Sequence, residues 1–284
     1  MDKLRVMVKI SAAAALAGVL TLATAGLAQQ PAPTSPPPAQ TPAPAAQPAA
    51  PAPPAPPAQV AAPSNPEGKA LIAKVVEAVG GAAKLGSVHA LRVKAAVDAK
   101  TSQGEFNIEL EQLAAFPDRS WQKLVTPMGD IILVTTPSVA FMAAPQGTQD
   151  LPEEQKDEAL KELKRDEIFV AQHVDDPKFT FTASGTAKVG DVDARILDVD
   201  ADGALVRWYV DPQNGRVLRR LARIVDMEGP ADQVLDFSDW KEFGGIPFPT
   251  KAKITRDGQD GGSVAVEAIE INPTVDAKLF ERPQ

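Results

Sequence analysis

The stretch EFNIELEQL, residues 105–113, alternates polar and apolar side chains as far as Glu111. Phe106, Ile108 and Leu110 fall on one face of an extended chain, and the acidic and amide side chains between them fall on the other. This period of two is typical of an antiparallel sheet with one buried face and one solvated face. The pattern predicts a strand here and a mainly β fold around it.

Similar segments follow on both sides of residues 105–113, and short turn sequences separate many of them. Tight turns join antiparallel neighbours, because a parallel pair needs a long crossover. We therefore expect one antiparallel sheet. Its further strands are expected at residues 90–100, 119–125, 130–136, 139–143, 178–184, 192–200, 204–211, 215–225, 232–240, 247–256 and 263–271.

The stretch DVDADG, residues 198–203, has the start of a calcium-binding loop, with acidic residues at alternate positions and Gly203 at the sixth. Such a loop needs a glutamate at position 12, where Tyr209 stands, and the flanks here alternate like strands. We therefore expect a hairpin turn rather than a metal site. Two more hairpin turns are expected in VDPQNGRV, residues 210–217, and in QDGG, residues 259–262.

Two segments repeat their apolar residues at helical spacing. A helix is expected over residues 66–79, and its apolar stripe consists of Leu71, Ile72, Val75, Val76 and Val79. A second is expected over residues 152–165, where Asp150 and Glu153 form a capping-box pattern. This second helix has a narrow apolar face, made by Leu151, Ala159, Leu160 and Leu163. We expect it to be a lid that rests on the rim of the core and moves at little cost in free energy.

The first 28 residues have the organisation of a secretory signal, with basic residues, an apolar run and then small residues. Residues 29–65 are almost entirely Pro, Ala, Gln, Ser and Thr, which predicts a disordered linker before a folded domain over residues 66–284. Loss of the signal, with its three basic and one acidic side chains, would change the net charge from −8 to −10, which opposes binding to nucleic acid. We expect an exported periplasmic protein, with an uncleaved inner-membrane anchor as the alternative.

The chain has few of the residues that catalysis uses. It contains no cysteine and only two histidines, His89 and His173, and it lacks the motifs of hydrolase nucleophiles, phosphate loops and zinc peptidases. A weak site could form from His173, Asp175 and Asp176, but a polar loop is the simpler interpretation. Four arginines within residues 216–223 are expected to pair with acids across the sheet, with a site for an acidic partner as the alternative. We expect no enzyme activity, no metal and no cofactor.

Five segments carry a resemblance to a known family. They are VGGAAKLGSVHALRVKAAV (79–97), FPDRSWQKLVTPMGDIILVTTPSVAFMAAP (116–145), the helix over 152–165, VRWYVDPQNGRVLR (206–219) and DFSDWKEFGGIPFPTKAKI (236–254). Together they resemble the periplasmic lipoprotein-sorting carriers of the LolA-like superfamily. The family motif around its tryptophan is matched by Pro117, Trp121, Thr126 and Pro127.

The resemblance implies an open, curved antiparallel half-barrel with helices in its mouth. It also implies lipid or lipoprotein acyl chains as ligands, partner proteins at the inner and outer membranes, and a role in outer membrane biogenesis. In the family an arginine precedes the proline and helps to hold the lid closed. Phe116 stands at that position in this chain.

A half-barrel covered by helices would leave apolar surface free for acyl chains, and burial of each methylene contributes about 0.8 kcal/mol. We predict that the binding surface is made by Phe106, Ile108, Leu110, Trp121, Met128, Phe141, Met142 and Trp208. We expect a carrier of lipid or lipoprotein acyl chains, with a hydrophobic cavity and a helical lid. The alternative is an anchored, non-enzymatic sensor or protein-interaction module with the same fold.

Overall fold

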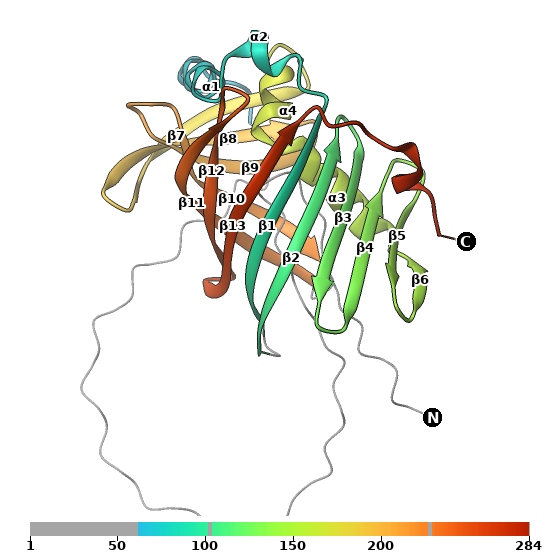
Figure 1. The fold of residues 1–284 in the computed structure, drawn as a ribbon. Helices are drawn as coiled ribbons and strands as arrows, with labels where there is room; N and C mark the ends of the chain where they lie inside the picture. The colour runs from blue at the N-terminus through green and yellow to red at the C-terminus, as the bar shows by residue number, and fades with distance from the viewer. Residues whose placement is uncertain (1–61, 102–103, 227–228, 284) are drawn as a thin grey trace, which may run out of the picture.

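The computed structural model describes residues 62–101, 104–226 and 229–283. The predicted signal and nearly all of the predicted linker lie outside these ranges. The described strands form one antiparallel sheet in the order β6-β5-β4-β3-β2-β1-β13-β12-β11-β10-β9-β8-β7. The sheet is curved and does not close, so β6 and β7 are its two edges (Figure 1). The expected open antiparallel half-barrel is confirmed.

All of the expected strands are present, and their boundaries differ from the expected ones by a few residues at most ends. The short edge strand β6 was not expected. The strands are β1 (Ala90–Thr101), β2 (Gly104–Ala115), β3 (Arg119–Thr126), β4 (Gly129–Thr135), β5 (Ala140–Ala144), β6 (Gly147–Asp150), β7 (Phe179–Val189), β8 (Val192–Ala201), β9 (Ala204–Val210), β10 (Val217–Asp226), β11 (Gly229–Phe243), β12 (Ile246–Arg256) and β13 (Gln259–Ile271).

The helices lie at one end of the sheet and inside its curve. Helices α1 (Pro66–Ala78), α2 (Ala82–Leu85) and α4 (Glu167–Gln172) gather at one end, and α3 (Glu153–Lys164) lies on the concave side behind β3 and β4 (Figure 1). The short helices α2 and α4 were not expected from the sequence. No helix in the described part of the chain has the length and apolar character needed to cross a membrane.

Helix α1 is attached firmly to the edge strand β7. The side chain of Asn65 caps the helix by accepting from the amide of Gly68 at 2.6 Å, and it also bonds both backbone groups of Ala183, at 3.0 and 3.1 Å. Gly68 is buried against β7, where any side chain would collide with the carbonyl oxygen of Phe181. The predicted apolar stripe of α1 is confirmed, because all five of its residues are buried in the core.

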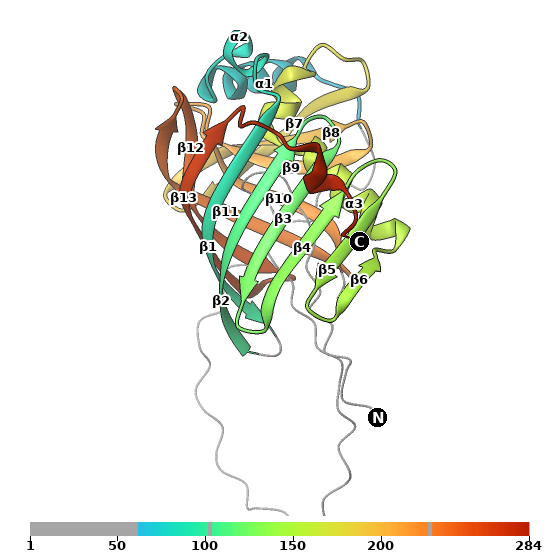
Figure 2. The same cartoon turned by 45° about the vertical axis from the view of Figure 1, so that its right-hand side comes forward.

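The two faces of the sheet carry separate apolar clusters. On β2, Ile108 and Leu110 point into the large inner core, whereas Leu113 points outward. The outer cluster consists of Ala90, Leu113, Trp121, Val134, Phe141 and Phe280. Phe280 comes from η1 (Ala277–Phe280), which lies against the outer side of β3 and β4 (Figure 2).

Three local predictions can be compared with the structure. DVDADG forms the β8–β9 turn, with positive φ at Asp202 (51°) and Gly203 (85°), so the hairpin is confirmed. The hairpin turn at residues 210–217 is also confirmed, with Gly215 at φ 75°. The turn expected at residues 259–262 is wrong. The chain turns two residues earlier, at Asp257 and Gly258, whose φ values of 46° and 79° suit a tight hairpin turn.

The predicted capping box on α3 is also wrong. Asp150 belongs to β6 and forms an ion pair with Arg282, and the helix starts after Pro152 with no side-chain cap. Pro152 suits a helix start because its fixed φ is compatible with the first turn and its missing amide hydrogen is not needed there. The helix boundaries nevertheless agree with the expected range.

Candidate functional site

The inner face of α3 carries buried charges as well as apolar residues. Glu158 and Glu162 are both buried, and both form ion pairs with the buried guanidinium of Arg165, at 2.8 Å for Glu162. Glu162 also forms an ion pair with Arg220, which points inward from β10. We refer to Glu158, Glu162, Arg165 and Arg220 as the ion-pair cluster. It contains two negative and two positive groups.

The ion-pair cluster joins the end of α3 to the sheet. Arg165 Nε donates to the carbonyl oxygen of Leu205 on β9 at 3.0 Å, and Nη2 donates to that of Arg223 on β10 at 3.3 Å. Burial lowers the pKa of Arg220 to about 9, against the opposing influence of Glu158. Separation of these charges would leave each of them buried without its partner, which is costly. The expectation of a lid that moves at little cost is therefore wrong for this end of α3.

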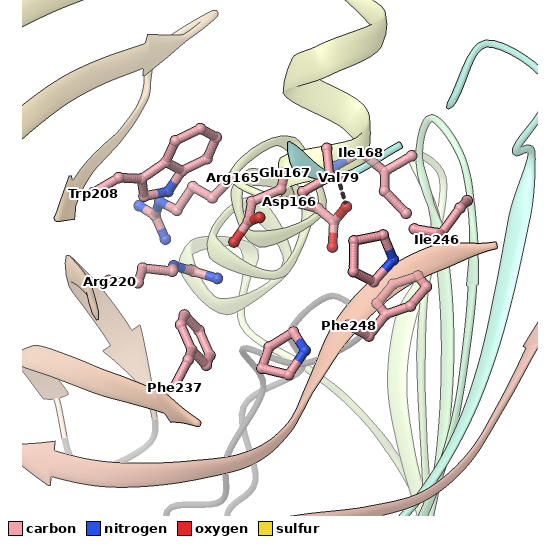
Figure 3. A pocket seen from close by; sticks show the side chains of 12 residues that line it. Val79, Arg165, Asp166, Glu167, Ile168, Trp208, Arg220, Phe237, Ile246 and Phe248 are labelled. Carbon is pink, nitrogen blue, oxygen red and sulfur yellow. Dashed lines mark hydrogen bonds between the residues drawn. The ribbon is translucent and has the colours of Figure 1, made fainter. Parts of the chain in front are cut away.

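A pocket lies beside the ion-pair cluster, between α4 and the start of β12 (Figure 3). Its interior is a cavity of about 50 Å³, and the empty space rises to about 530 Å³ when the open mouth is included. Its walls are mainly apolar. The lining residues are Val79, Arg165, Asp166, Glu167, Ile168, Trp208, Arg220, Phe237, Ile246, Pro247, Phe248 and Pro249.

Two carboxyl groups at the start of α4 point into this pocket (Figure 3). Asp166 caps the helix by accepting from the amide of Ile168 at 2.9 Å, and burial raises its pKa to about 6 against the effect of its backbone hydrogen bonds. Burial raises the pKa of Glu167 to about 8, and the neighbouring charge of Asp166 adds to this increase. No described side chain forms a hydrogen bond or an ion pair with Glu167.

Trp208 on β9 forms another wall of the pocket. Its side chain is fully buried, and its indole Nε1 has no hydrogen-bond acceptor in the described structure. Buried polar groups are nearly always paired, so an indole donor without an acceptor at a pocket wall requires an explanation. The pocket therefore combines apolar walls with unpaired polar groups.

The residues predicted to bind acyl chains do not all lie together. Ile108, Leu110, Met142 and Trp208 are in the inner core, and Phe106 is partly buried against it. Among these, only Trp208 lines the pocket.

The other three predicted residues point elsewhere. Trp121 pairs with the outward-facing Leu113 and belongs to the outer cluster, as does Phe141. Met128 is 48% exposed in the turn between β3 and β4. For Trp121 and Phe141 the alternation of side chains along a strand explains the error, because neighbouring residues point to opposite faces. The prediction that Trp121, Phe141 and Met128 face the cavity is therefore wrong.

The histidines have structural surroundings. The ring of His173 lies 4.2 Å from that of Phe169 and 5.2 Å from that of Phe179, and its Nδ1 is 2.7 Å from the carbonyl oxygen of Phe169. His89 is exposed before β1. Within the described ranges, no three histidine, aspartate or glutamate side chains are grouped closely enough to hold a metal ion.

The arginines of β10 separate by face. Arg219 pairs with Asp236 and Arg223 with Asp232 on β11, which confirms the expected pairing across the sheet. Arg220 instead points inward to Glu162. Phe116, at the family's arginine position, packs against the α4 residue Phe169 with ring centroids 6.1 Å apart. This position therefore contacts the covering helices through an aromatic side chain.

Sequence reasoning missed the two groups of charged residues. Glu158 and Glu162 are four residues apart and lie on the same helical face as Ala159 and Leu163, which is a readable sign of partial burial. Asp166 and Glu167 gave no such sign, because α4 is only six residues long and its start was not expected.

No known family model and no curated protein sequence matches the chain. Solved structures do match. A LolA superfamily protein from Nitrosomonas europaea has 12% identity and a TM-score of 0.51, and the match covers 76% of this chain and 97% of that protein. A DUF1329 family protein from Desulfovibrio piger has 12% identity and a TM-score of 0.50, with coverage of 75% and 97%. The chain therefore has the LolA-like fold.

Proposed function

We propose that this protein is an exported periplasmic carrier that binds lipid or lipoprotein acyl chains under its helices. The observation that carries the proposal is the apolar pocket between α4 and β12, on the concave side of a sheet that does not close. Ligand sites of proteins are typically concave and mostly apolar, with a few polar groups that orient the ligand. The LolA-like fold supports the same proposal, because the family it resembles carries acyl chains.

The energetics require no catalytic group. Each buried methylene contributes about 0.8 kcal/mol, so a chain of a dozen methylenes would contribute on the order of 10 kcal/mol before ordering costs. The apolar residues that would contact the acyl chain include Ile168, Phe237, Ile246 and Phe248. We expect α4 and the start of β12 to move apart when a long chain enters.

The test is lipid uptake by the purified chain. We expect native mass spectrometry after gentle purification to show a bound acyl species, and a fluorescent fatty acid to bind the emptied protein. Val79→Phe should reduce this binding, because Val79 lines the pocket and the larger ring would occupy it. Val125→Phe is the matched control, because Val125 is 38% exposed on a distant strand. An empty protein that takes up neither a fatty acid nor an uncharged or cationic acyl ester would contradict the proposal.

The proposed export is tested separately. Residues 1–28 are proposed to be removed as a signal and residues 29–65 to be a disordered linker. Expression of the full chain in a Gram-negative host should give a periplasmic product whose intact mass lacks the first 25 or 28 residues. A membrane-bound product of full mass would show a retained anchor.

A second candidate is an anchored sensor or protein-interaction module. It is favoured by the ion-pair cluster, which fills part of the concave side with residues that already have partners. This function predicts a retained anchor, no copurified lipid and no fatty-acid uptake. The same two experiments therefore separate the two candidates.

A further inference from the structure

We propose that the pocket selects acyl lipids whose headgroup carries a positively charged nitrogen close to an ester or amide carbonyl. This inference rests on the proposed function and names its ligand class. It is argued from the charges of the pocket, its unpaired donor and its aromatic walls.

The pocket contains more acidic groups than free cations. Its two bases, Arg165 and Arg220, are already paired with Glu158 and Glu162 behind the wall. Asp166 and Glu167 have no such basic partner, and Glu167 has no hydrogen-bond donor either. A carboxyl group in apolar surroundings is stabilised in its charged form by a nearby cation. A ligand cation would supply the positive charge that no described side chain of the protein provides for Asp166 and Glu167.

The indole of Trp208 adds an independent requirement. Its Nε1 can only donate, its side chain is fully buried, and no acceptor in the described ranges reaches it. Figure 3 shows Trp208 on the side of the pocket where Arg165 and Glu167 lie. A cation alone cannot satisfy this donor. An ester or amide oxygen near the cation can, once the entering ligand has moved α4 and the start of β12 apart and uncovered the indole, which has no accessible surface in this structure.

The aromatic walls suit the same headgroup. Trp208, Phe237 and Phe248 line the pocket with Ile246 and Pro247. Cationic nitrogen is attracted to aromatic faces, and the attraction is strongest for tryptophan and increases when the site is desolvated. A free fatty acid or another anionic headgroup would instead face the two carboxyl groups. The pocket therefore discriminates by charge as well as by apolar contact.

The test compares three ligands with the same acyl chain, by calorimetry and by displacement of a fluorescent fatty acid. The ligands are lauroylcholine, its uncharged carbon analogue 3,3-dimethylbutyl laurate, and laurate. We expect the wild-type protein to bind lauroylcholine about tenfold or more tightly than the uncharged analogue, since a desolvated cation beside a carboxyl and aromatic rings gains more than 1.4 kcal/mol. Laurate should bind most weakly.

Two substitutions locate the effect. Glu167→Gln keeps the shape but removes the charge, so the ratio between lauroylcholine and its analogue should fall to about threefold or less. Trp208→Phe keeps an aromatic wall but removes the donor, so lauroylcholine should lose its advantage over an alkyltrimethylammonium ion of equal length. Circular dichroism and thermal unfolding show whether each variant is folded, and the comparison of ligands on the wild-type protein needs no variant.

The pH dependence gives a further readout, because the choline nitrogen does not titrate. The preference for lauroylcholine should increase between pH 6 and pH 9, as Glu167 loses the proton that its raised pKa of about 8 retains. The other charged groups of the pocket are Asp166, which ionises at lower pH, and the paired Arg165 and Arg220. The increase should be absent in Glu167→Gln.

The outcomes separate this inference from the proposed function. Equal binding of all three ligands, or tightest binding of laurate, would overturn the headgroup inference and leave the carrier function standing. Binding of none of them would overturn both. Retention of the lauroylcholine preference in Glu167→Gln would overturn the assignment to this carboxyl group.

Discussion

Two regions on the concave side of the sheet contain charged groups, which are buried in the ion-pair cluster and partly buried in the pocket, and the regions also differ in how those charges are paired. In the ion-pair cluster every charge of Glu158, Glu162, Arg165 and Arg220 has an opposite charge in contact. In the pocket, Asp166 and Glu167 lie at the start of α4 without a basic partner. The first region is complete and fixes α3 to the sheet. The carboxyl groups of the second region lack basic partners, and this is the property expected of a site that binds a separate ligand.

The largest predicted effect is a loss of stability, and it comes from a substitution in the ion-pair cluster. Glu162→Ala would leave Arg220 and part of Arg165 buried without compensation, so we expect the free energy of unfolding to fall by about 3–5 kcal/mol. Urea denaturation measures this loss. The matched control is Glu153→Ala on the same helix, because Glu153 is exposed and pairs with Lys156 at 2.6 Å. Its expected cost is about 0.5 kcal/mol or less.

A substitution on the opposite face tests the division of the sheet into two sides. Phe141 is buried in the outer cluster, so Phe141→Ala should lower the free energy of unfolding by about 3 kcal/mol. Because Phe141 points away from the pocket, the folded variant should bind a fluorescent fatty acid as tightly as the wild type. A marked loss of affinity at a temperature where the variant is folded would place the ligand on the outer face.

The incomplete region predicts an unusual dependence of stability on pH. The pKa of Glu167 is raised from 4.5 to about 8, so between these values the folded protein holds a proton that the unfolded chain has lost. Stability from this group is present below pH 4.5 and is lost as the pH rises to 8. Glu167→Gln removes that loss, so the variant should exceed the wild type at pH 8 by on the order of 1–3 kcal/mol, an estimate reduced for partial exposure.

Urea denaturation of both proteins from pH 4.5 to pH 9 checks this prediction. The two curves should converge at the acidic end and separate steadily above it. Parallel curves over the whole range would mean that Glu167 titrates normally. The pocket would then lack the raised pKa of Glu167 that distinguishes it from the ion-pair cluster.

The smallest predicted effect compares neighbours on one strand. Arg219 and Arg220 are consecutive on β10, but Arg219 faces outward to Asp236, and both partners there are partly exposed. We expect Arg219→Ala to change the free energy of unfolding by about 1 kcal/mol or less. The same measurement on Arg220→Ala should give a loss several times larger. Equal losses would show that burial of the inner charges has no special cost.

The fold could be predicted from the sequence because its local signals agree. Alternation on residues 105–113, helical spacing on residues 66–79 and the turn glycines Gly203 and Gly215 each depend on neighbouring residues alone. The site could not be predicted in the same way. Which of two alternating faces is concave depends on the curvature of the whole sheet, so Trp121 and Phe141 were assigned to the wrong side.

The pairing of buried charges is equally non-local. Arg220 meets Glu162 across 58 residues of chain, and no spacing rule connects them. The pocket itself is assembled from α4, β9, β10, β11 and β12 together with Val79 after α1. Residues 165–168 and 246–249 contribute four lining residues each, and Val79, Trp208, Arg220 and Phe237 come singly from four other segments. Only the composition of the walls, rich in aromatic and branched side chains, was foreseeable.

The chain between the two edge strands has a mechanical consequence. Strand β6 ends at Asp150 and β7 begins at Phe179, so α3 and α4 form a strap fastened to both free edges of the sheet. A strap held at two points cannot swing aside as a door on one hinge does. A long acyl chain would have to spread the edges or enter through the mouth of the pocket between α4 and the start of β12. A covalent crosslink holding the edges at their present separation would then distinguish these two routes, because it blocks only the first.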